Sequence, residues 1–187
     1  MRGALETAHE RASCNMTGMA VLLNQTSNLQ LRIELLERIS DGTRQPASLA
    51  MRVSVERYRN EPRGFVTMLA VPRATLLDMD LIEFLRALEE LLDGRVEAAA
   101  LEASVDPAIG LRLAGGPDAY LVEIGIDLLN VLQSVGQDLP AERGADLMLV
   151  RFAANKRAAV AFCAQLLEDF ARYPTDPSQV GKGQRDG

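Results

Sequence analysis

The stretch DLIEFLRALEELLDG, residues 80–94, decides the fold of this chain. Its apolar residues recur every three or four positions, which is the spacing of a helix with one buried face. Asp80 and Glu83 have the spacing of a capping box at the helix start, and Gly94 supplies a stop. The expected buried face comprises Leu81, Phe84, Leu85, Leu88, Leu91 and Leu92. Such a face has to pack against another element, and the flanking sequence predicts that this element is a sheet.

Three segments before the helix are predicted to be strands. Apolar and polar residues alternate within residues 29–35 and 47–56, which is the period of a strand with one wet face. Residues 65–71 are predicted to be a third strand because they follow a break at residues 60–64. Turn-forming residues separate these segments, and Pro72 is expected to end the third strand. Together they predict an antiparallel meander.

A second meander is predicted after the helix, from residues 96–103, 109–113, 122–128 and 147–152, with an exposed loop over residues 134–144. Asn155 is placed to cap a closing helix that Pro174 stops. The apolar stripe expected on that helix contains Val160, Cys163, Leu167 and Phe170, with Phe162 and Leu166 beside it. The predicted fold class is α+β, an antiparallel β-sheet of two meanders with two helices packed on it.

The 187 residues are enough for one domain with a proper core. We expect a flexible leader over residues 1–27, a single α+β domain over residues 28–173 and a disordered tail over residues 174–187. Met1, Met16 and Met19 are alternative starts. Neither a secretory signal nor an apolar run long enough to span a membrane is visible, so we expect a cytoplasmic protein.

The formal charge of −6 has the wrong sign for a nucleic-acid surface, because such binding depends on Lys and Arg. If charge guides a partner, that partner is basic. A mildly acidic surface also keeps a protein in solution, without any partner.

Residues for most kinds of catalysis are missing from the expected domain. The sole histidine is His9, in the leader, so a histidine-based triad or metal cluster is not expected. Cys14 and Cys163 are expected to be free thiols, and Cys163 lies on an apolar helix face. Gly110, Gly115 and Gly116 are interpreted as turn glycines. We therefore expect neither catalytic residues, nor a cofactor, nor a metal.

Carboxylates leave two further interpretations open. A pair drawn from Glu102, Asp106, Glu123 and Asp127 would serve a glycosidase or a hard cation. The spacing gives this little support, and the solvated face of an antiparallel sheet is the preferred explanation of Glu123 and Asp127. On the helix, Asp80, Glu83 and Glu90 lie away from the buried stripe. They form either a solvated face or an acidic docking surface, and we take them as the candidate partner-binding residues.

The order of the elements resembles that of the WapI-type immunity proteins of bacterial polymorphic toxin systems. The resemblance covers Leu29 to Tyr173. The matching positions are Leu31-Arg32-Ile33, Gly64-Phe65, Asp80-Leu81, Phe84, Leu88, Leu91, Gly94, Leu101-Glu102, Leu111-Arg112-Leu113, Leu147 and Leu149. It implies a protein that neutralises a cognate toxin by binding it, without a cofactor or turnover.

Two alternatives to an immunity protein remain. One is an acidic secretion chaperone, a class that also packs helices on an antiparallel sheet and often forms homodimers. The other is a small-ligand or carboxylate enzyme domain, which a deep pocket containing Glu102, Glu123 and Asp127 would favour. If the acidic helix face is not the binding site, the open sheet face around Arg52, Ser54 and Glu56 is the next candidate.

Overall fold

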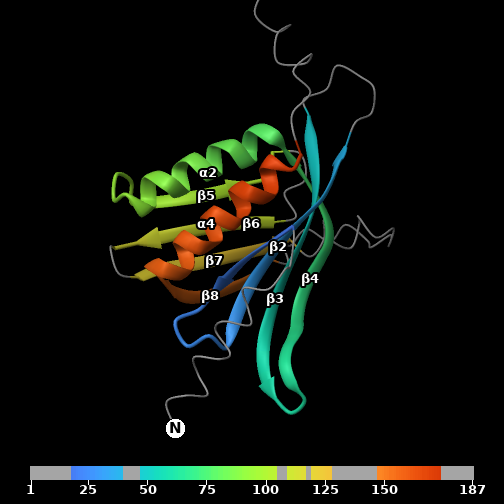
Figure 1. The fold of residues 1–187 in the computed structure, drawn as a ribbon, viewed down its shortest axis with the longest axis vertical. Helices are drawn as coiled ribbons and strands as arrows, with labels where there is room; N and C mark the ends of the chain where they lie inside the picture. Colours follow the sequence, from blue (N-terminus) through green and yellow to red (C-terminus); the bar gives the residue numbers. More distant parts are fainter. Residues whose placement is uncertain (1–17, 40–46, 105–108, 117–118, 128–146, 174–187) are drawn as a thin grey trace, which may run out of the picture.

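A computed structural model describes residues 18–39, 47–104, 109–116, 119–127 and 147–173. The described elements follow one another as four strands, a helix, four strands and a helix (Figure 1). They are β1 (Met19–Leu23), β2 (Leu29–Ile39), β3 (Ser48–Asn60), β4 (Arg63–Leu77), α2 (Asp78–Leu92), β5 (Ala98–Glu102), β6 (Ile109–Gly115), β7 (Ala119–Asp127), β8 (Leu147–Asn155) and α4 (Lys156–Ala171).

The strands form two separate antiparallel sheets, with the orders β1-β2-β3-β4 and β5-β6-β7-β8. Every neighbouring pair is consecutive in the chain, so each sheet is a meander, and the connection from Asp127 of β7 to Leu147 of β8 is a long one. The predicted α+β class, with two meanders and two helices, is confirmed. The predicted outline of the strands is also right, although the first meander has four strands where three were expected.

The chain therefore contains the same unit twice, four strands followed by a helix. The units correspond in register: Leu31 pairs with Leu22 and Val55 in the first sheet, as Leu111 pairs with Leu101 and Ile124 in the second. The arginine after each of these leucines, Arg32 or Arg112, therefore has the same place in its sheet.

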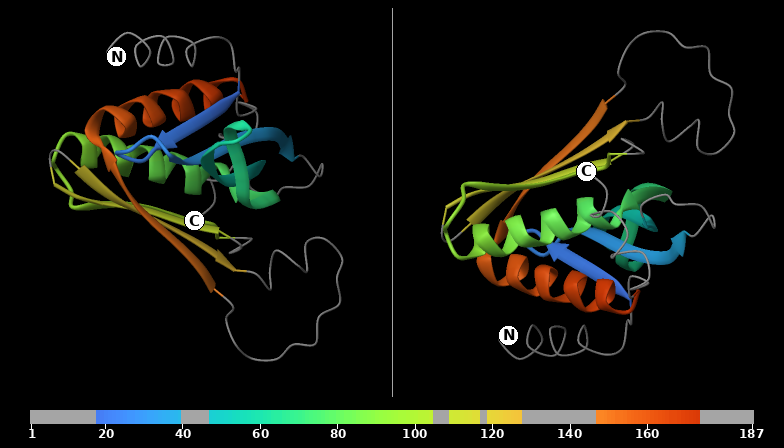
Figure 2. Two further views of the ribbon diagram at one scale, coloured as in Figure 1. Left: turned by 90° about the horizontal axis from the view of Figure 1, so that it is seen from below. Right: turned by 90° about the horizontal axis from the view of Figure 1, so that it is seen from above.

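Each helix packs against the sheet of the other unit. Helix α2 contacts β5 at the edge of the second sheet, whereas α4 contacts β1 at the edge of the first, and the two helices touch each other. Figure 2 shows the helices side by side along these edge strands. The Val21 N–H of β1 donates a 2.9 Å hydrogen bond to the Gln165 side-chain oxygen of α4. The two units are thus interlocked around one core.

Helix α2 buries the stripe expected from the sequence. Leu81, Phe84, Leu85, Leu88 and Leu91 are all buried, and Leu92 is half-buried. The stripe predicted for α4 is partly wrong, because Val160 and Leu167 are exposed while Phe162, Cys163 and Leu166 are buried. The buried face is rotated because α4 packs against β1 and against α2, not only against its own sheet.

The predicted leader is wrong for Met19–Leu23, which forms β1. Ala20 and Leu22 are fully buried, and the strand pairs with β2 from Met19↔Glu34 to Leu23↔Gln30. A strand of five residues is too short to show clear periodicity in the sequence. The predictions for residues 1–17, for the loop at 134–144, and for Pro174 with the tail lie outside the described residues.

Strand β4 does not end at Pro72 but continues to Leu77. Proline is compatible with this position because β4 is an edge strand, and because the register between β3 and β4 shifts between Met51/Ala74 and Val53/Val71. At an irregularity on an edge, the missing N–H of proline costs no ladder hydrogen bond.

The start of α2 differs from the predicted capping box. The helix begins at Asp78, so Asp80 occupies the third helical position and its carboxylate accepts a 3.2 Å hydrogen bond from the Leu77 N–H. Asp80 thus does what Glu83 was expected to do, one turn earlier. The predicted stop is correct: Gly94 has a φ of +74°, and the N–H groups of Gly94 and Arg95 donate to Leu91 and Glu90.

We expect Leu88→Ala to lower the free energy of unfolding by about 2–5 kcal/mol, because Leu88 is fully buried and its truncation leaves a cavity. Urea unfolding of both proteins measures the loss. Ile82→Ala, on the exposed face of the same helix, is the matched control and should change stability by only about 0.5 kcal/mol. Similar losses for the two variants would contradict the packing described above.

Candidate functional site

Asp80, the first predicted partner-binding residue, is already engaged within the fold. Besides the Leu77 N–H, its carboxylate accepts hydrogen bonds from the Ser104 N–H at 3.1 Å and the Ser104 hydroxyl at 2.6 Å. These bonds tie the first turn of α2 to the chain that follows β5. Asp80 is therefore better explained as a residue that positions the helix than as one that meets a partner.

The other two predicted acids lie closer to solvent. Glu83 is exposed and Glu90 is half-buried, and their separation of seven residues places them on the same side of α2. The helix from Asp78 to Leu92 has five acidic residues and one arginine, so its formal charge is −4. Its solvent side is the acidic surface that the sequence predicted.

Two large apolar side chains also lie on this solvent side and were not predicted. Met79 is 55% exposed and Ile82 is 42% exposed, although both are in the first turns of a well-packed helix. Their positions are out of phase with the buried leucines, and that phase difference is the signal that could have found them. We call Met79, Ile82, Glu83 and Glu90 the α2 surface.

The carboxylates considered for catalysis lie on the outer face of the second sheet, and there they are spread apart. Glu102 is on β5 while Glu123 and Asp127 are on β7, with β6 between them. Four residues along a strand separate Glu123 from Asp127 by about 13 Å, beyond the separations used by glycosidase pairs. Asp106 lies outside the described residues.

Glu123 is held between two arginines. Its carboxylate accepts a 2.9 Å bond from Arg112 on β6 and a 2.7 Å bond from Arg151 on β8. The hydrogen bond from Arg112 lowers the pKa of Glu123 below its ordinary value, and the bond from Arg151 adds to this, while partial desolvation opposes both. A carboxylate held ionised in this way is a poor proton donor.

The alternative sheet face around Arg52, Ser54 and Glu56 is also largely occupied by internal bonds. Ser54 and Glu56 are buried, and Glu56 accepts hydrogen bonds from the Gln30 amide at 2.6 Å and the Ser54 hydroxyl at 3.0 Å. Arg52 forms a 3.1 Å ion pair with Glu34. These groups stabilise contacts between strands of the first sheet.

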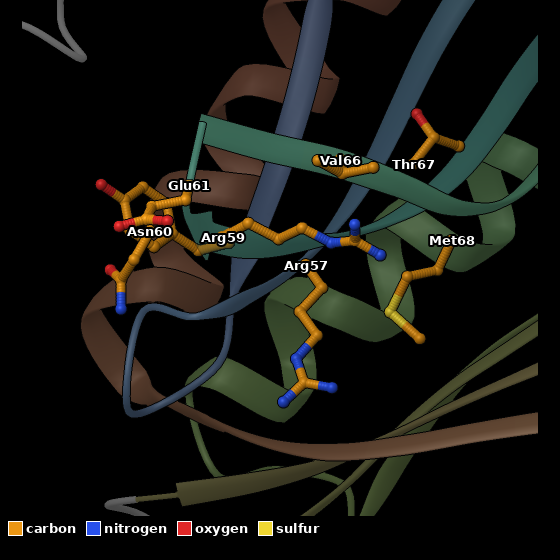
Figure 3. A pocket seen from close by; sticks show the side chains of 8 residues that line it. Arg57, Arg59, Asn60, Glu61, Val66, Thr67 and Met68 are labelled. Carbon is orange, nitrogen blue, oxygen red and sulfur yellow. The ribbon is translucent and has the colours of Figure 1, made fainter. Parts of the chain in front are cut away.

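A hollow of about 600 Å³ lies on the hairpin of β3 and β4 (Figure 3). Its lining residues are Arg57, Tyr58, Arg59, Asn60, Glu61, Val66, Thr67 and Met68. The sequence analysis treated this segment only as two strand ends and a turn. The sequence feature that could have indicated this hollow is the group of three arginines, at 57, 59 and 63, with a single glutamate among them.

The described residues hold few groups suited to nucleophilic or metal chemistry. Cys163 is buried in the core, and burial raises the pKa of its thiol to about 11, so the thiol stays protonated at neutral pH. Within the described ranges, no group of three or more His, Cys, Asp or Glu side chains is arranged to hold a metal ion. His9 and Cys14 lie outside those ranges. No helix among the described elements is both long enough and apolar enough to cross a bilayer.

Comparisons with known proteins leave the family open. No family model and no curated protein matches the chain. Among solved structures, the crystal structures of Trypanosoma brucei MRP1/MRP2 are similar, with 12% identity and a TM-score of 0.45 over 92% of this chain and 95% of that one. At this distance the likeness says nothing about function. The resemblance to WapI-type immunity proteins stays a prediction.

The two arginine contacts give Glu123 a predictable effect on acid stability. A carboxyl whose pKa is lowered by folding stabilises the folded state above its ordinary pKa of 4.5, and this contribution disappears as the pH falls through the lowered value. We therefore expect Glu123→Gln to be less stable than the natural chain near neutral pH and to approach it on acidification below pH 4.5. Urea midpoints over a pH series measure this, with exposed Glu97→Gln as control. A constant gap between Glu123→Gln and the natural chain would contradict it.

Proposed function

We propose that this chain is a non-enzymatic protein-binding protein whose partner docks on the α2 surface. The observation that carries the proposal is the exposure of Met79 and Ile82 directly beside Glu83. Interfaces between proteins combine such an apolar centre with a polar rim. About half of each side chain is already covered, so burying the rest contributes about 1 kcal/mol for each of the two residues.

The charge of α2 supports a basic partner. Asp78 is buried against Arg38 and Asp80 is engaged within the fold, so the charge that faces solvent comes from Glu83, Glu89 and Glu90. Three acids against Arg86 attract a cationic surface from a distance, which accelerates encounter and disfavours acidic competitors. Arg86 lies between Glu83 and Glu90 on the exposed side, so the charge is mixed at the contact itself. The apolar pair therefore provides the attraction at short range, and the acids provide the steering.

The specific form that we propose is an immunity protein that binds and neutralises a cognate toxin domain. This form rests on the resemblance in the order of elements and on an acidic docking surface suited to a basic toxin. The wide separation of Glu102, Glu123 and Asp127 supports binding over carboxylate catalysis. A partner can be isolated by capture from the native host with the full chain, followed by mass spectrometry.

With the captured partner in hand, we expect Glu83→Lys combined with Glu90→Lys to slow association several-fold at low ionic strength, and we expect the effect to shrink as salt is added. Ile82→Asp should instead speed dissociation, because it removes short-range apolar contact. Stopped-flow or surface-based kinetics measures both rates.

Glu97→Lys combined with Glu102→Lys is the matched control, because it makes the same change of charge at exposed positions outside the α2 surface. This control should leave the association rate nearly unchanged. If both double variants slow association equally, the effect depends on the net charge of the protein and not on the α2 surface. Rates that ignore both double variants and Ile82→Asp would place the binding site elsewhere.

A further inference from the structure

The hairpin of β3 and β4 extends beyond the sheet that carries it. The pairing of β2 with β3 starts at Leu29↔Arg57, whereas β3 and β4 pair as far as Asn60↔Arg63. Residues 58–60 and 63–65 pair with each other, the Tyr58 N–H also donates a 2.8 Å hydrogen bond to the Asn28 carbonyl, and beyond this bond the hairpin end projects from the body of the protein (Figure 1). Residues 57–60 are all exposed, so both faces of β3 are open to solvent at this end.

Two arginines share one face where the hairpin leaves the sheet: Arg57 forms the last pair with β2, and Arg59 lies beyond it. Arg57 and Arg59 are two residues apart on β3, so they lie on the same face of the strand as Val53 and Val55, which are part of the core. In the core that face is buried, but at Arg57 and Arg59 it is exposed. This face of β3 is therefore apolar within the core and cationic just beyond the core.

The guanidinium groups of these arginines are not neutralised by the neighbouring chain. Within the described residues, Arg57, Arg59 and Arg63 form no ion pair. The arginines that do are Arg32, Arg38, Arg52, Arg73, Arg95, Arg112, Arg151 and Arg172. Residues 57–68 contain three arginines and one glutamate, a formal charge of +2 in a chain of −6. The hairpin is thus a local cationic site on an acidic protein.

Apolar groups adjoin the two arginines in the hollow. Val66 pairs directly with Arg57 across the hairpin, and Met68 is the extra residue where the register shifts between Val55/Leu69 and Glu56/Thr67. Met68 is 60% exposed, and Figure 3 shows its side chain on the same side of the hairpin as Arg57. The hollow of about 600 Å³ therefore combines cationic and apolar lining.

This combination fits a peptide with acidic and apolar side chains better than it fits a nucleic acid. Guanidinium groups bind carboxylates in a bidentate manner, and a thioether adapts to varied apolar side chains. Proteins that bind single-stranded nucleic acids combine a cationic groove with aromatic rings that stack with the bases in the same groove. Here the two rings of the hairpin, Tyr58 and Phe65, form a pair across the strands on the face opposite Arg57 and Arg59, where they pack edge to face at 5.5 Å.

We propose that the hairpin hollow binds an acidic peptide segment of a protein partner, with its carboxylates on Arg57 and Arg59 and an apolar side chain against Val66 and Met68. This site goes beyond the α2 surface, because its charge is opposite and it recruits a ligand of opposite chemistry. It would let one molecule hold a basic surface and an acidic segment at the same time.

The test uses the full chain and a fluorescein-labelled peptide of glutamate, leucine and glycine, with fluorescence polarisation as the readout. The comparison probes are the same peptide with glutamine at each glutamate, and a labelled thymidine oligonucleotide. We expect the acidic peptide to bind, the neutral peptide not to bind, and the oligonucleotide to bind more weakly than the acidic peptide.

Arg57→Gln combined with Arg59→Gln should weaken binding of the acidic peptide by about tenfold or more, because two charge-assisted contacts are lost. Lysine at both positions should restore part of the affinity, since it keeps the charge but not the bidentate fork. Arg73→Gln combined with Arg95→Gln makes the same change of charge at exposed positions outside the hollow and should leave binding unchanged. Unfolding midpoints verify that each variant is folded.

Four results would overturn the proposal. They are equal binding of the neutral peptide, tighter binding of the oligonucleotide, equal losses in the two double variants, and peptide-free association of the chain that disappears when Arg57 and Arg59 are replaced. The last result would assign the hairpin to a second copy of the chain. Glu83→Lys with Glu90→Lys should not weaken peptide binding, so failure here is distinguishable from failure of the α2 surface.

Discussion

Each helix covers the first strand of the sheet that belongs to the other unit, and the rest of the molecule depends on this exchange. Helix α2 packs on β5 and α4 on β1, so neither four-stranded sheet has its edge and apolar face covered by its own helix alone. A polar contact holds the exchange in place: Arg38 of β2 pairs with Asp78 at the start of α2 and also donates to the carbonyl of Tyr173, after α4. The Tyr173 hydroxyl in turn donates to the carbonyl of Leu35 at 2.9 Å. One buried core therefore forms from two units that each present an open apolar face.

The interlock also determines which surfaces are left for partners. On the outer face of each sheet, arginines are balanced by acids from neighbouring strands, as in Arg112, Glu123 and Arg151, or in Arg32 and Glu56 at 3.8 Å. Such cross-strand pairs contribute modestly to sheet stability, and they partly or fully neutralise the arginines. Among the described residues, the solvent side of α2 and the end of the β3–β4 hairpin are two of the places where charge is not balanced in this way. One is acidic and the other basic, and each has exposed apolar side chains beside the charge. Binding at either place would leave the core and the interlock unchanged.

Most of the fold could be predicted from the sequence because its signals are local. The alternation in residues 29–35 and 109–113 depends only on which side of a strand faces water, and both segments are strands. Asn155 caps α4 by accepting a 2.8 Å hydrogen bond from the Ala158 N–H, as its position before the helix indicates. Pro72 misled the prediction because its effect on a strand depends on whether that strand is at an edge, which is a property of the sheet order. The α4 stripe was misplaced for a related reason, since the packing partner of α4 is far away in the sequence.

The sequence by itself determined the α+β class, the two meanders, the leucine face of α2 and the acidic character of that helix. The tertiary structure decided which of those acids are free. Asp80 looked equivalent to Glu83 and Glu90 on a helical projection, but the chain after β5 brings Ser104 to it and its carboxylate is occupied. Likewise, Arg57 and Arg59 look like ordinary strand residues until the fold places Arg57 at the end of β2 and Arg59 beyond it, without an ion pair among the described residues. The physical reason is the same in both cases: hydrophobic periodicity is a property of neighbouring residues, whereas the availability of a charged group depends on what distant segments bring within a few ångströms of it.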